Sequence, residues 1–579
     1  MKKSPFIIYL IGAATLGVSC ESINQATKTS NSAAKPAVTQ KTDTGKSTAD
    51  SGKAKPDPTK KAPDAGKKEM KKTPDAPPKK PKKAESAGKK APNADKKNIK
   101  KAPDAAPKKP KQPTGTAPGK AKKSGGADWR GWGGTPERNM VNDAETNMPT
   151  DWNVETGKNI KWSAELGSQS YGNPTVHKGK VFVGTNNEAA RDPNITGDKG
   201  NIMAFNEADG KFLWQAIFDK LPAGRVNDWP LQGICSTPWI EGDRMYFVNN
   251  RCEMICADTE GFLDGENDGF QDEKYKGDDK ADIVWKFDMI EELAIFPHNL
   301  ATSSPYVKGD LVFIVSGNGV DEGHLNLPSP DASAFMAFNK KTGELVWEYY
   351  EVGRVLHGQW SSPTHGKVGD QEMTLMPGGD GILYAINPSD GKLVWKFDLN
   401  PTDSVWELGG YGTRNNLIST PVFVDGHVYL GVGQDPEHGS GIGHFFKIDA
   451  NGKGDITATA AKWHIGNKDF GRTMSTAAVK DGLVYIADLE GYLYCLDDKT
   501  GKIVWKDDLT AATWGSPKVI DGKVYIGDED GDIRIVKHGR EKELINEVTM
   551  DQSVYTTPTA ANGVLYIATK SKLYAIANQ

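Results

Sequence analysis

Apolar and polar positions alternate in short runs that recur eight times between residue 173 and the end of the chain. Each copy begins with a polar residue that proline follows in seven cases, passes a polar gap and a Gly turn, and then enters an apolar strand. The starting pairs are Asn173-Pro174, Thr237-Pro238, Ser304-Pro305, Ser362-Pro363, Thr420-Pro421, Thr476-Ala477, Ser516-Pro517 and Thr557-Pro558. Period-two alternation predicts strands, and eight copies of one β unit predict a repeat architecture.

Each copy continues with a third strand, a Thr-Gly or Asp-Gly turn and a fourth strand that ends in tryptophan. Residues 383–386, the turn at Asp390-Gly391 and residues 393–395 form one clear example. Glycine in these turns supplies the positive φ that a short hairpin needs. Each unit is therefore predicted to be a four-stranded antiparallel blade, and the fold class to be an all-β, eight-bladed β-propeller.

The end of the chain indicates how the blades close into a ring. The eighth unit has strands near residues 557, 565–568 and 573–576, and the chain stops at Gln579 before a fourth strand. An unassigned strand at residues 159–162, ending in Trp162, precedes the first unit. We expect the segment 158–164 to complete the last blade, because that pairing removes two exposed sheet edges.

A repeated phrase close to Leu-Tyr-Ala-x-Asp-x-x-Thr-Gly-Lys-x-x-Trp stands at residues 383–395 and 493–505 and more loosely at 335–347 and 203–214. With this phrase, residues 128–579 resemble the eight-bladed PQQ-like (pyrroloquinoline quinone) propellers. That family includes quinoprotein alcohol dehydrogenases and the BamB lipoproteins, which scaffold outer-membrane protein assembly. The resemblance implies that the recurring tryptophans dock between blades. They are Trp162, Trp214, Trp285, Trp347, Trp395, Trp463 and Trp505.

Composition divides the rest of the chain. Residues 1–20 carry Lys2 and Lys3, a short apolar run and Cys20, which together are typical of a lipoprotein-type signal peptide. Lipidation of Cys20 would anchor the protein to a membrane, and Glu21 favours the outer membrane over the inner one. The alternative is a plain cleaved signal with an incidental cysteine. Either signal predicts an exported protein of the periplasm or cell surface.

Residues 21–127 form a Lys-, Pro- and Ala-rich stretch with a net charge of +18. Almost no large apolar side chains occur there, so we expect a disordered linker that acts as a tether. Contact of this basic linker with anionic envelope polymers or nucleic acid is the alternative interpretation. Residues 128–579 carry a net charge of −24, so no specific binding of nucleic acid is expected.

Cysteine contributes little beyond location. Cys235, Cys252, Cys256 and Cys495 have neither haem-attachment nor zinc-finger spacing. Cys235 and Cys252 belong to one unit, so an oxidised pair after export and a set of small buried residues are both consistent with the pattern.

In a propeller, the loops that enter each first strand and the loops between second and third strands reach the same face. Cations, amides and aromatic residues gather on these loops and could hold a planar anionic ligand or a peptide. The alternative is that many of them satisfy buried loop backbone. The candidate residues are Arg225, Asp228, Trp229, Gln232, His357, Gln359, Trp360, Arg414, Asn415, Asn416, Gln434, Asp435, Glu437, His438, Arg472 and Trp514.

The resemblance raises PQQ and calcium as possible cofactors. Arg414, Asn415 and a tryptophan platform have the chemical types that a quinone with carboxylates needs, with Asp435 and Glu437 as stand-ins for calcium ligands. The adjacent cysteines typical of the quinoprotein dehydrogenases are missing. A separate acidic loop with Asp264, Glu266 and Asp268 resembles the start of a calcium loop, but Tyr275 stands where the closing glutamate belongs. A solvated acidic loop is the alternative.

Two functions remain open at this stage. The first is a binding or assembly scaffold in the cell envelope, with a protein, peptide or glycan partner. The second is a periplasmic PQQ- and calcium-dependent dehydrogenase that oxidises an alcohol or a sugar. Blade repeats alone do not distinguish a scaffold from an enzyme.

Overall fold

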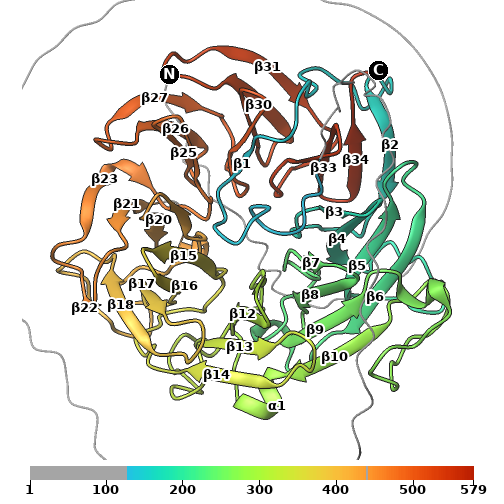
Figure 1. Cartoon of the computed structure of the whole chain (residues 1–579), viewed down its shortest axis with the longest axis horizontal. Helices are drawn as coiled ribbons and strands as arrows, with labels where there is room; N and C mark the ends of the chain where they lie inside the picture. The colour runs from blue at the N-terminus through green and yellow to red at the C-terminus, as the bar shows by residue number, and fades with distance from the viewer. Residues whose placement is uncertain (1–126, 439–440) are drawn as a thin grey trace, which may run out of the picture. The chain divides into compact units, whose positions relative to one another are not determined.

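The computed structural model describes residues 127–438 and 441–579, and in them the strands form eight sheets around a central opening (Figure 1). The predicted signal peptide and linker lie outside these residues. No helix in the described ranges is long and apolar enough to span a bilayer. The all-β, eight-bladed propeller predicted from the repeats is confirmed.

Each blade is an antiparallel sheet whose first strand lies innermost. Blade 1 contains β3 (Thr175–His177), β4 (Lys180–Asn186), β5 (Lys199–Asn206) and β6 (Phe212–Asp219). Blade 2 contains β7 (Trp239–Glu241), β8 (Arg244–Val248), β9 (Glu253–Asp258) and β10 (Ile283–Asp288). Blade 3 contains β11 (Tyr306–Lys308), β12 (Leu311–Val315), β13 (Phe335–Asn339) and β14 (Leu345–Tyr349). Blade 4 contains β15 (Thr364–Val368), β16 (Gln371–Pro377), β17 (Ile382–Ile386) and β18 (Leu393–Asp398), with β22 (Gly454–Asp455) added in parallel at its outer edge.

The second half of the ring repeats this order. Blade 5 contains β19 (Val422–Val424), β20 (His427–Gly433), β21 (Ile442–Asp449) and β23 (Ala461–Gly471). Blade 6 contains β24 (Ala478–Lys480), β25 (Leu483–Ala487), β26 (Tyr492–Asp497) and β27 (Ile503–Asp508). Blade 7 contains β28 (Lys518–Ile520), β29 (Lys523–Gly527), β30 (Asp532–Lys537) and β31 (Leu544–Thr549). Four short helical turns lie in loops: η1 (Gly224–Val226), η2 (Gly261–Asp264), α1 (Met289–Leu293) and η3 (Pro436–His438).

Blade 8 joins the two ends of the ring. It contains β32 (Thr559–Ala561), β33 (Val564–Ala568) and β34 (Lys572–Ile576), and its fourth strand is β2 (Ile160–Glu165). Trp162 of β2 lies opposite Ala575 of β34 in an antiparallel register. The strand that precedes the first blade thus supplies the strand that the last blade lacks.

The repeated Ser/Thr-Pro phrase builds a belt of hydrogen bonds from blade to blade. The Thr237 amide donates to Ser304 Oγ and the Ser304 amide to Ser362 Oγ, both at 2.9 Å. The Ser516 amide donates to Thr557 Oγ1, and the Thr557 amide donates to Asn173 Oδ1 at 2.7 Å. The last bond returns to blade 1. Between blades 4 and 5 and between blades 5 and 6 the link shifts to the Ser361 and Ser419 hydroxyls, which donate to the Ser419 and Ser475 carbonyls.

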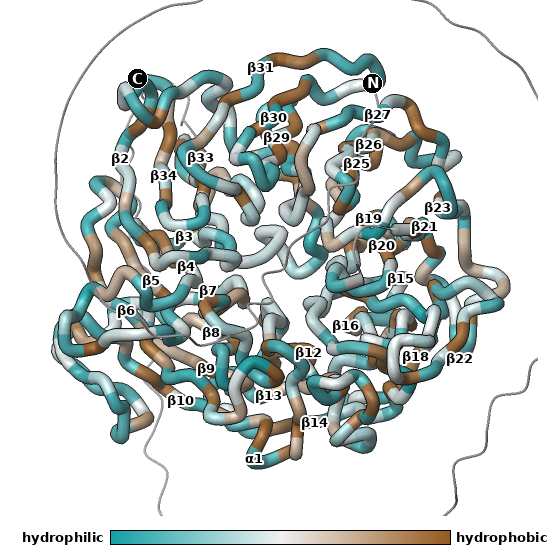
Figure 2. The backbone as a smooth tube through the Cα atoms, turned by 180° about the vertical axis from the view of Figure 1, so that it is seen from behind, coloured by the Kyte–Doolittle hydropathy of each residue, from teal (hydrophilic) through white to brown (hydrophobic). Residues whose placement is uncertain are grey.

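The blade tryptophans form a second, outer set of contacts. Six indole N–H groups donate to a backbone carbonyl in the following blade, at 2.7–3.1 Å: Trp162, Trp214, Trp285, Trp347, Trp463 and Trp505. Trp395 is fully buried and instead donates to Met373 Sδ in its own blade. Hydrophobic backbone segments fall mainly on the strands in the body of the blades, and hydrophilic ones on the connecting loops (Figure 2). Packing between blades therefore forms the core.

Residues 129–145, here called the strap, cross the central opening before the ring begins (Figure 1). The strap includes β1 (Val141–Asn142), which pairs in parallel with β28. It bonds to blades 1, 2, 4, 5 and 6 through backbone groups, to blade 7 through β1 and to blades 3 and 8 through the side chains of Arg138 and Asn142. These seventeen residues thus contact every blade, and the repeat pattern does not predict this arrangement.

Candidate functional site

Three histidines and one glutamate converge on the loop face, and each comes from a different loop. His298 lies between α1 and β11, and His324 in the long β12–β13 loop. His357 precedes β15, and Glu437 belongs to η3 in the β20–β21 loop. Their ligand atoms all lie within 4.8 Å of one another, and among the described residues this is the one such group of three or more His, Cys, Asp or Glu side chains.

Backbone pairing brings the histidine loops together. The Val320 amide donates to the His357 carbonyl at 2.8 Å, and the His298 amide donates to the Gly317 carbonyl at 3.3 Å. Gly319 lies at the crossing point, where a Cβ would be 2.2 Å from the His357 carbonyl oxygen and 2.7 Å from His298 Cβ. Only glycine permits this approach, so the contact between the two histidine loops requires a glycine at position 319.

The distances within the cluster are short. His324 Nε2 lies 3.2 Å from His298 Nε2 and 4.0 Å from Glu437 Oε2. His357 Nε2 lies 3.5 Å from the same carboxylate oxygen. His298 and His357 are buried, whereas His324 is partly exposed and Glu437 reaches the surface.

Neighbouring groups fix the orientation of two cluster members. His298 Nδ1 lies 2.8 Å from the Val320 carbonyl, which can only accept, so Nδ1 carries the proton and Nε2 presents its lone pair to the cluster. Asn299 Nδ2 donates to Glu437 Oε1 at 3.0 Å and leaves Oε2 turned toward the histidines. The Trp360 indole donates to the His298 carbonyl at 2.9 Å and holds the backbone of that loop.

Charge is distributed unevenly over these groups. Burial and the neighbouring His357 lower the pKa of His298 to about 4, and burial also lowers the pKa of His324. Burial opposes protonation of His357, but Glu437 and Asp435 overcome it and raise its pKa. The bond to His357 lowers the pKa of Glu437 to about 2, and burial raises the pKa of Asp435 to about 6.

Several predicted site residues surround the cluster in blades 4 to 6. A small cavity of about 30 Å³ is lined by His324, His357, Arg414, Asn416, Gln434 and Asp435, among others. Arg472 donates to Gln434 Oε1 at 3.0 Å, and Asn416 Nδ2 donates to the Gly358 carbonyl at 3.0 Å. Arg414 is buried, and its guanidinium donates to the Asp380 carbonyl and to Asp398 Oδ2, each at 3.0 Å. Asn415 is buried beside it, and its amide donates to Asn400 Oδ1 at 2.6 Å.

Other predicted residues serve local contacts elsewhere. Arg225 pairs with Glu322 at 2.6 Å and stacks on Trp229, and Asp228 is buried against Lys220 and Asn250. Trp514 donates to Glu529 at 2.6 Å. Gln232 lies near Cys235, and Gln359 is buried. Trp360 is the exception, because it contacts the cluster residue His298, while His438 is described by its backbone alone. The structure therefore gathers part of the predicted set and disperses the rest.

The second blade carries the acidic loop and the cysteines. Asp268 pairs with Arg244 at 2.7 Å, and Asp264 Oδ1 accepts the Glu266 amide, so the three carboxylates do not converge on one point. A cavity of about 310 Å³ lies between this insertion and the blade, lined by Phe218, Phe270 and Tyr275 among others. All four cysteines in the described ranges are free thiols, and Cys252, Cys256 and Cys495 are buried. The three buried cysteines are small core residues, and Cys235 and Cys252 do not form a disulfide.

Sequence reasoning named His357 and Glu437 but missed His298 and His324. The chain has only ten histidines. His324 lies in the surplus loop at 318–333, and His298 stands seven residues before Pro305 of the starting pair, as His357 stands close before Pro363. The scarcity of histidine, combined with its placement on loops of one face, is the signal that could have found the cluster.

Comparison with known proteins shows which families this chain is similar to. The family model described as outer membrane protein assembly factor BamB matches residues 278–440 and 448–542. BamB of Moranella endobia is 21% identical over 72% of this chain and 89% of its own length. Tetrathionate hydrolase of Acidithiobacillus ferrooxidans is 26% identical over 36% of this chain, a match that spans only 41% of that enzyme.

One solved structure extends the fold comparison. The quinohemoprotein alcohol dehydrogenase of Pseudomonas putida HK5 aligns over 79% of this chain and 81% of its own, with a TM-score of 0.50 and 12% identity. At that identity the likeness concerns the fold alone. The family-model match, the BamB relatives and the closed ring of eight four-stranded blades confirm the resemblance to the PQQ-like propellers that the repeated blade phrase indicates.

Proposed function

We propose that this protein is an exported scaffold of the cell envelope that binds a partner protein through the loop face. The observation that carries the proposal is a group of exposed apolar side chains on two loops of that face, here called the apolar patch. Leu325, Val405, Trp406 and Tyr411 are 64%, 47%, 41% and 74% exposed. Large aromatic and aliphatic side chains left in solvent are typical of protein interfaces.

The two loops of the apolar patch, β12–β13 with Leu325 and β18–β19 with the other three residues, are joined by a hydrogen bond. The Gly409 amide donates to the His324 carbonyl at 2.7 Å, and the Trp406 indole donates to the Val355 carbonyl at 3.2 Å. A Cβ at Gly409 would lie 3.5 Å from Leu325 and 3.7 Å from Tyr411, so these two side chains flank the same point. An apolar surface on loops that hydrogen bonds fix in place suits a partner protein better than a glycan, whose hydroxyl groups need polar contacts.

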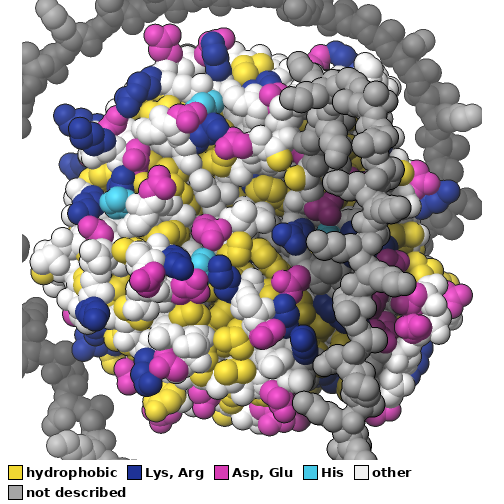
Figure 3. Space-filling view, in the orientation of Figure 1, with side chains coloured by type: hydrophobic (Ala, Val, Ile, Leu, Met, Phe, Trp, Pro, Cys, Tyr) yellow, Lys and Arg dark blue, Asp and Glu magenta, His cyan; other side chains and the backbone are white. Residues whose placement is uncertain are grey.

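The comparisons support the envelope setting. BamB, whose name describes an outer membrane protein assembly factor, is matched over 89% of its length. The predicted signal at residues 1–20, lipidation at Cys20 and the basic linker at 21–127 would anchor the propeller to a membrane, with the outer membrane favoured, and let it reach its partner. On the face seen in Figure 3, Lys and Arg side chains lie among Asp and Glu side chains, which does not favour a nucleic acid partner.

The alternative of a PQQ-dependent dehydrogenase fits the residues poorly. Arg414, the candidate for the quinone carboxylates, is buried and already bonded to Asp380 and Asp398. The cavity beside it measures about 30 Å³, whereas cofactor sites of this kind occupy roughly 300 Å³ or more. These residues therefore do not fit PQQ.

Site-specific photo-crosslinking in the cell envelope tests the scaffold. A photoreactive residue at Tyr411 should give one discrete protein adduct that Trp406→Ser abolishes, and the same residue at Leu544, which is 53% exposed on β31, should give none. Equal adducts at both positions, an adduct with carbohydrate instead of protein, or no adduct would each overturn the proposal. As a check on the alternative, PQQ with calcium should leave the melting temperature unchanged, and a rise that Arg414→Ala removes would favour the enzyme.

A further inference from the structure

The four cluster atoms have the spacing of ligands on one metal ion. Zinc binds histidine nitrogen and carboxylate oxygen at about 2.0–2.2 Å, so adjacent ligands on a tetrahedral ion lie about 3.4 Å apart. The separations of 3.2, 3.5 and 4.0 Å between the cluster atoms bracket that value. Small side-chain rotations would place all four atoms on one ion.

The surroundings of the cluster have the form of a metal site. Histidine ligands usually donate their second ring N–H to a carbonyl or carboxylate, which fixes the tautomer and turns the other nitrogen to the metal. His298 makes this contact with the Val320 carbonyl at 2.8 Å. Asn299 similarly fixes the far oxygen of Glu437 at 3.0 Å. Two of the four ligands are therefore oriented before any ion arrives.

A second histidine pair in the chain shows what an ordinary contact looks like. His444 Nδ1 lies 2.9 Å from His464 Nε2 in blade 5, and His464 stacks on Phe446. A single hydrogen bond accounts for that pair, and among the described residues it joins no group of three or more possible ligands. In the cluster, by contrast, three imidazoles and a carboxylate point at one centre, which pairwise bonding does not require.

We propose that His298, His324, His357 and Glu437 bind one zinc ion. Three imidazoles and one carboxylate suit zinc, and four protein ligands complete its tetrahedral coordination without an open position, as in structural sites. The ion would join loops of blades 3, 4 and 5, including the loop in which Leu325 follows His324. The proposal does not depend on the partner-binding function, since the ion is held by this chain alone.

Metal binding by the full chain, stripped with chelator and titrated with zinc, tests the site. One zinc per chain should be retained, and His324→Ala and Glu437→Gln should each weaken binding by about 100-fold or more. Asn299→Ala, which removes an orienting contact, should weaken it by about 10-fold to 100-fold. His464→Ala is the matched control and should bind zinc as the wild type does. Equal zinc retention in the wild type and in both ligand variants, or no retention at micromolar zinc, would overturn the proposal.

Cobalt provides a readout that does not depend on the variants folding. Wild-type protein loaded with Co²⁺ should show the intense visible absorption of a tetrahedral ion, and zinc should displace it. A weak octahedral spectrum would overturn the closed four-ligand site. Zinc should also raise the melting temperature of the wild type and of His464→Ala, but not that of His324→Ala.

Discussion

The strap and the histidine cluster both bury polar side chains near the opening of the ring, but they do so in opposite ways. In the strap, Arg138 is fully buried and donates to the carbonyls of Trp132, Ser304, Pro305 and Pro363 at 2.7–3.0 Å. In the cluster, side-chain nitrogens and oxygens face one another. The strap bonds mainly to the innermost strands themselves, whereas the cluster lies on loops that connect strands.

This difference separates a structural role from a binding role. Each of the four hydrogen bonds from Arg138 ends on a backbone carbonyl, so the guanidinium is accounted for by the fold. The cluster concentrates lone pairs at one point, an arrangement that a fold does not need and that a cation stabilises. Buried polar groups that end on backbone indicate architecture, and those that end on each other indicate a ligand.

The largest expected effect follows from removing the strap's central cation. Arg138→Met leaves four buried carbonyls without their donor, and each such loss costs roughly 1–3 kcal/mol, partly offset by the desolvation of the guanidinium. We expect the free energy of unfolding to fall by about 3–5 kcal/mol, measured by urea denaturation. Arg130→Met is the matched control, because Arg130 is an exposed strap residue, and it should change little. A loss as small as that of the control would mean that the strap is not a structural element.

The next largest effect is expected from a substitution of Gly319, which lies at the histidine cluster. Gly319→Ala places a methyl group 2.2 Å from the His357 carbonyl oxygen, so the two histidine loops must separate. We expect the free energy of unfolding to fall by about 1–3 kcal/mol and zinc affinity to fall by at least 10-fold.

A second glycine in the same loop is the control for this substitution. At Gly323 the nearest atom to an added Cβ is 3.5 Å away, so Gly323→Ala should leave zinc affinity unchanged. Calorimetric zinc titration of both variants measures the difference. Equal affinity in Gly319→Ala and the wild type would show that the loop contact does not build the site.

The architecture could be predicted from the sequence because the pattern of one blade recurs eight times. Alternating strands and Gly turns recur in the same order from unit to unit, with terminal tryptophans such as Trp505 in most of them. The fourth strand that the last unit lacks points directly to the pairing of β2. The strap could not be predicted in this way. Its stability depends on Arg138 reaching carbonyls 166 to 225 residues away, and backbone carbonyls carry no sequence signature.

The candidate site could be predicted only in part, for a related reason. His357 and Glu437 stood on loops that the blade pattern assigns to one face, so their proximity followed from topology. Whether Arg414 faces the cavity or the protein depends on Asp380 and Asp398, which nothing in the spacing reveals. The direction of the His298 ring depends on the Val320 carbonyl beside its Nδ1, and that contact has no sequence signature.

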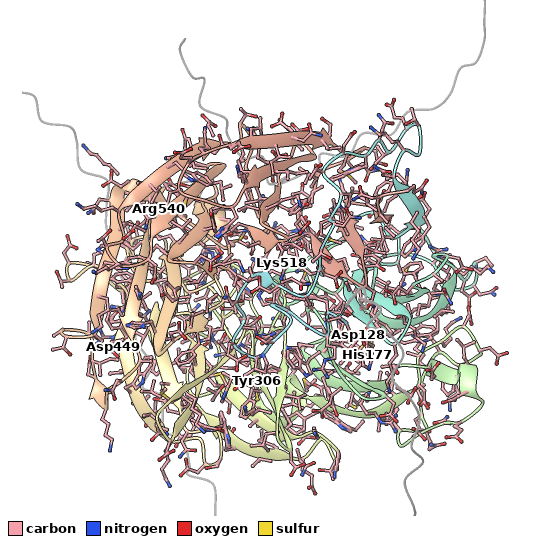
Figure 4. The ribbon with its side chains drawn as sticks, turned by 45° about the horizontal axis from the view of Figure 1, so that its top comes forward. Asp128, His177, Tyr306, Asp449, Lys518 and Arg540 are labelled. Atoms are coloured by element: carbon pink, nitrogen blue, oxygen red, sulfur yellow. The ribbon has the colours of Figure 1, made fainter. Side chains whose placement is uncertain are left out.

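The smallest expected effect concerns Lys518 of β28, which lies beside the strap (Figure 4). Unlike Arg138, this buried cation faces an aromatic ring and a sulfur atom and not backbone carbonyls. Its ammonium is buried 3.3 Å from the centre of the Trp129 ring of the strap, with Met140 Sδ at 3.9 Å. Burial lowers its pKa well below the usual range of lysine. Lysine in the unfolded chain therefore binds a proton that the folded chain resists, which costs stability at neutral pH. Lys518→Met should raise the free energy of unfolding by about 1 kcal/mol at pH 7.

The pH dependence distinguishes this charge effect from a change in packing. As pH rises from the lowered folded pKa of Lys518 toward the pKa of unfolded lysine, near about 10.4, the unfolded chain loses its proton and the cost disappears. The advantage of Lys518→Met over the wild type should therefore be greatest at the lowest pH and shrink as the pH rises above 7. Urea denaturation at several pH values measures it. An advantage that stays constant with pH would mean that methionine merely packs better. A loss of stability at pH 7 would mean that the contact of the ammonium with Trp129 outweighs its desolvation. In that case the Lys518 charge would stabilise the strap, as the Arg138 charge does.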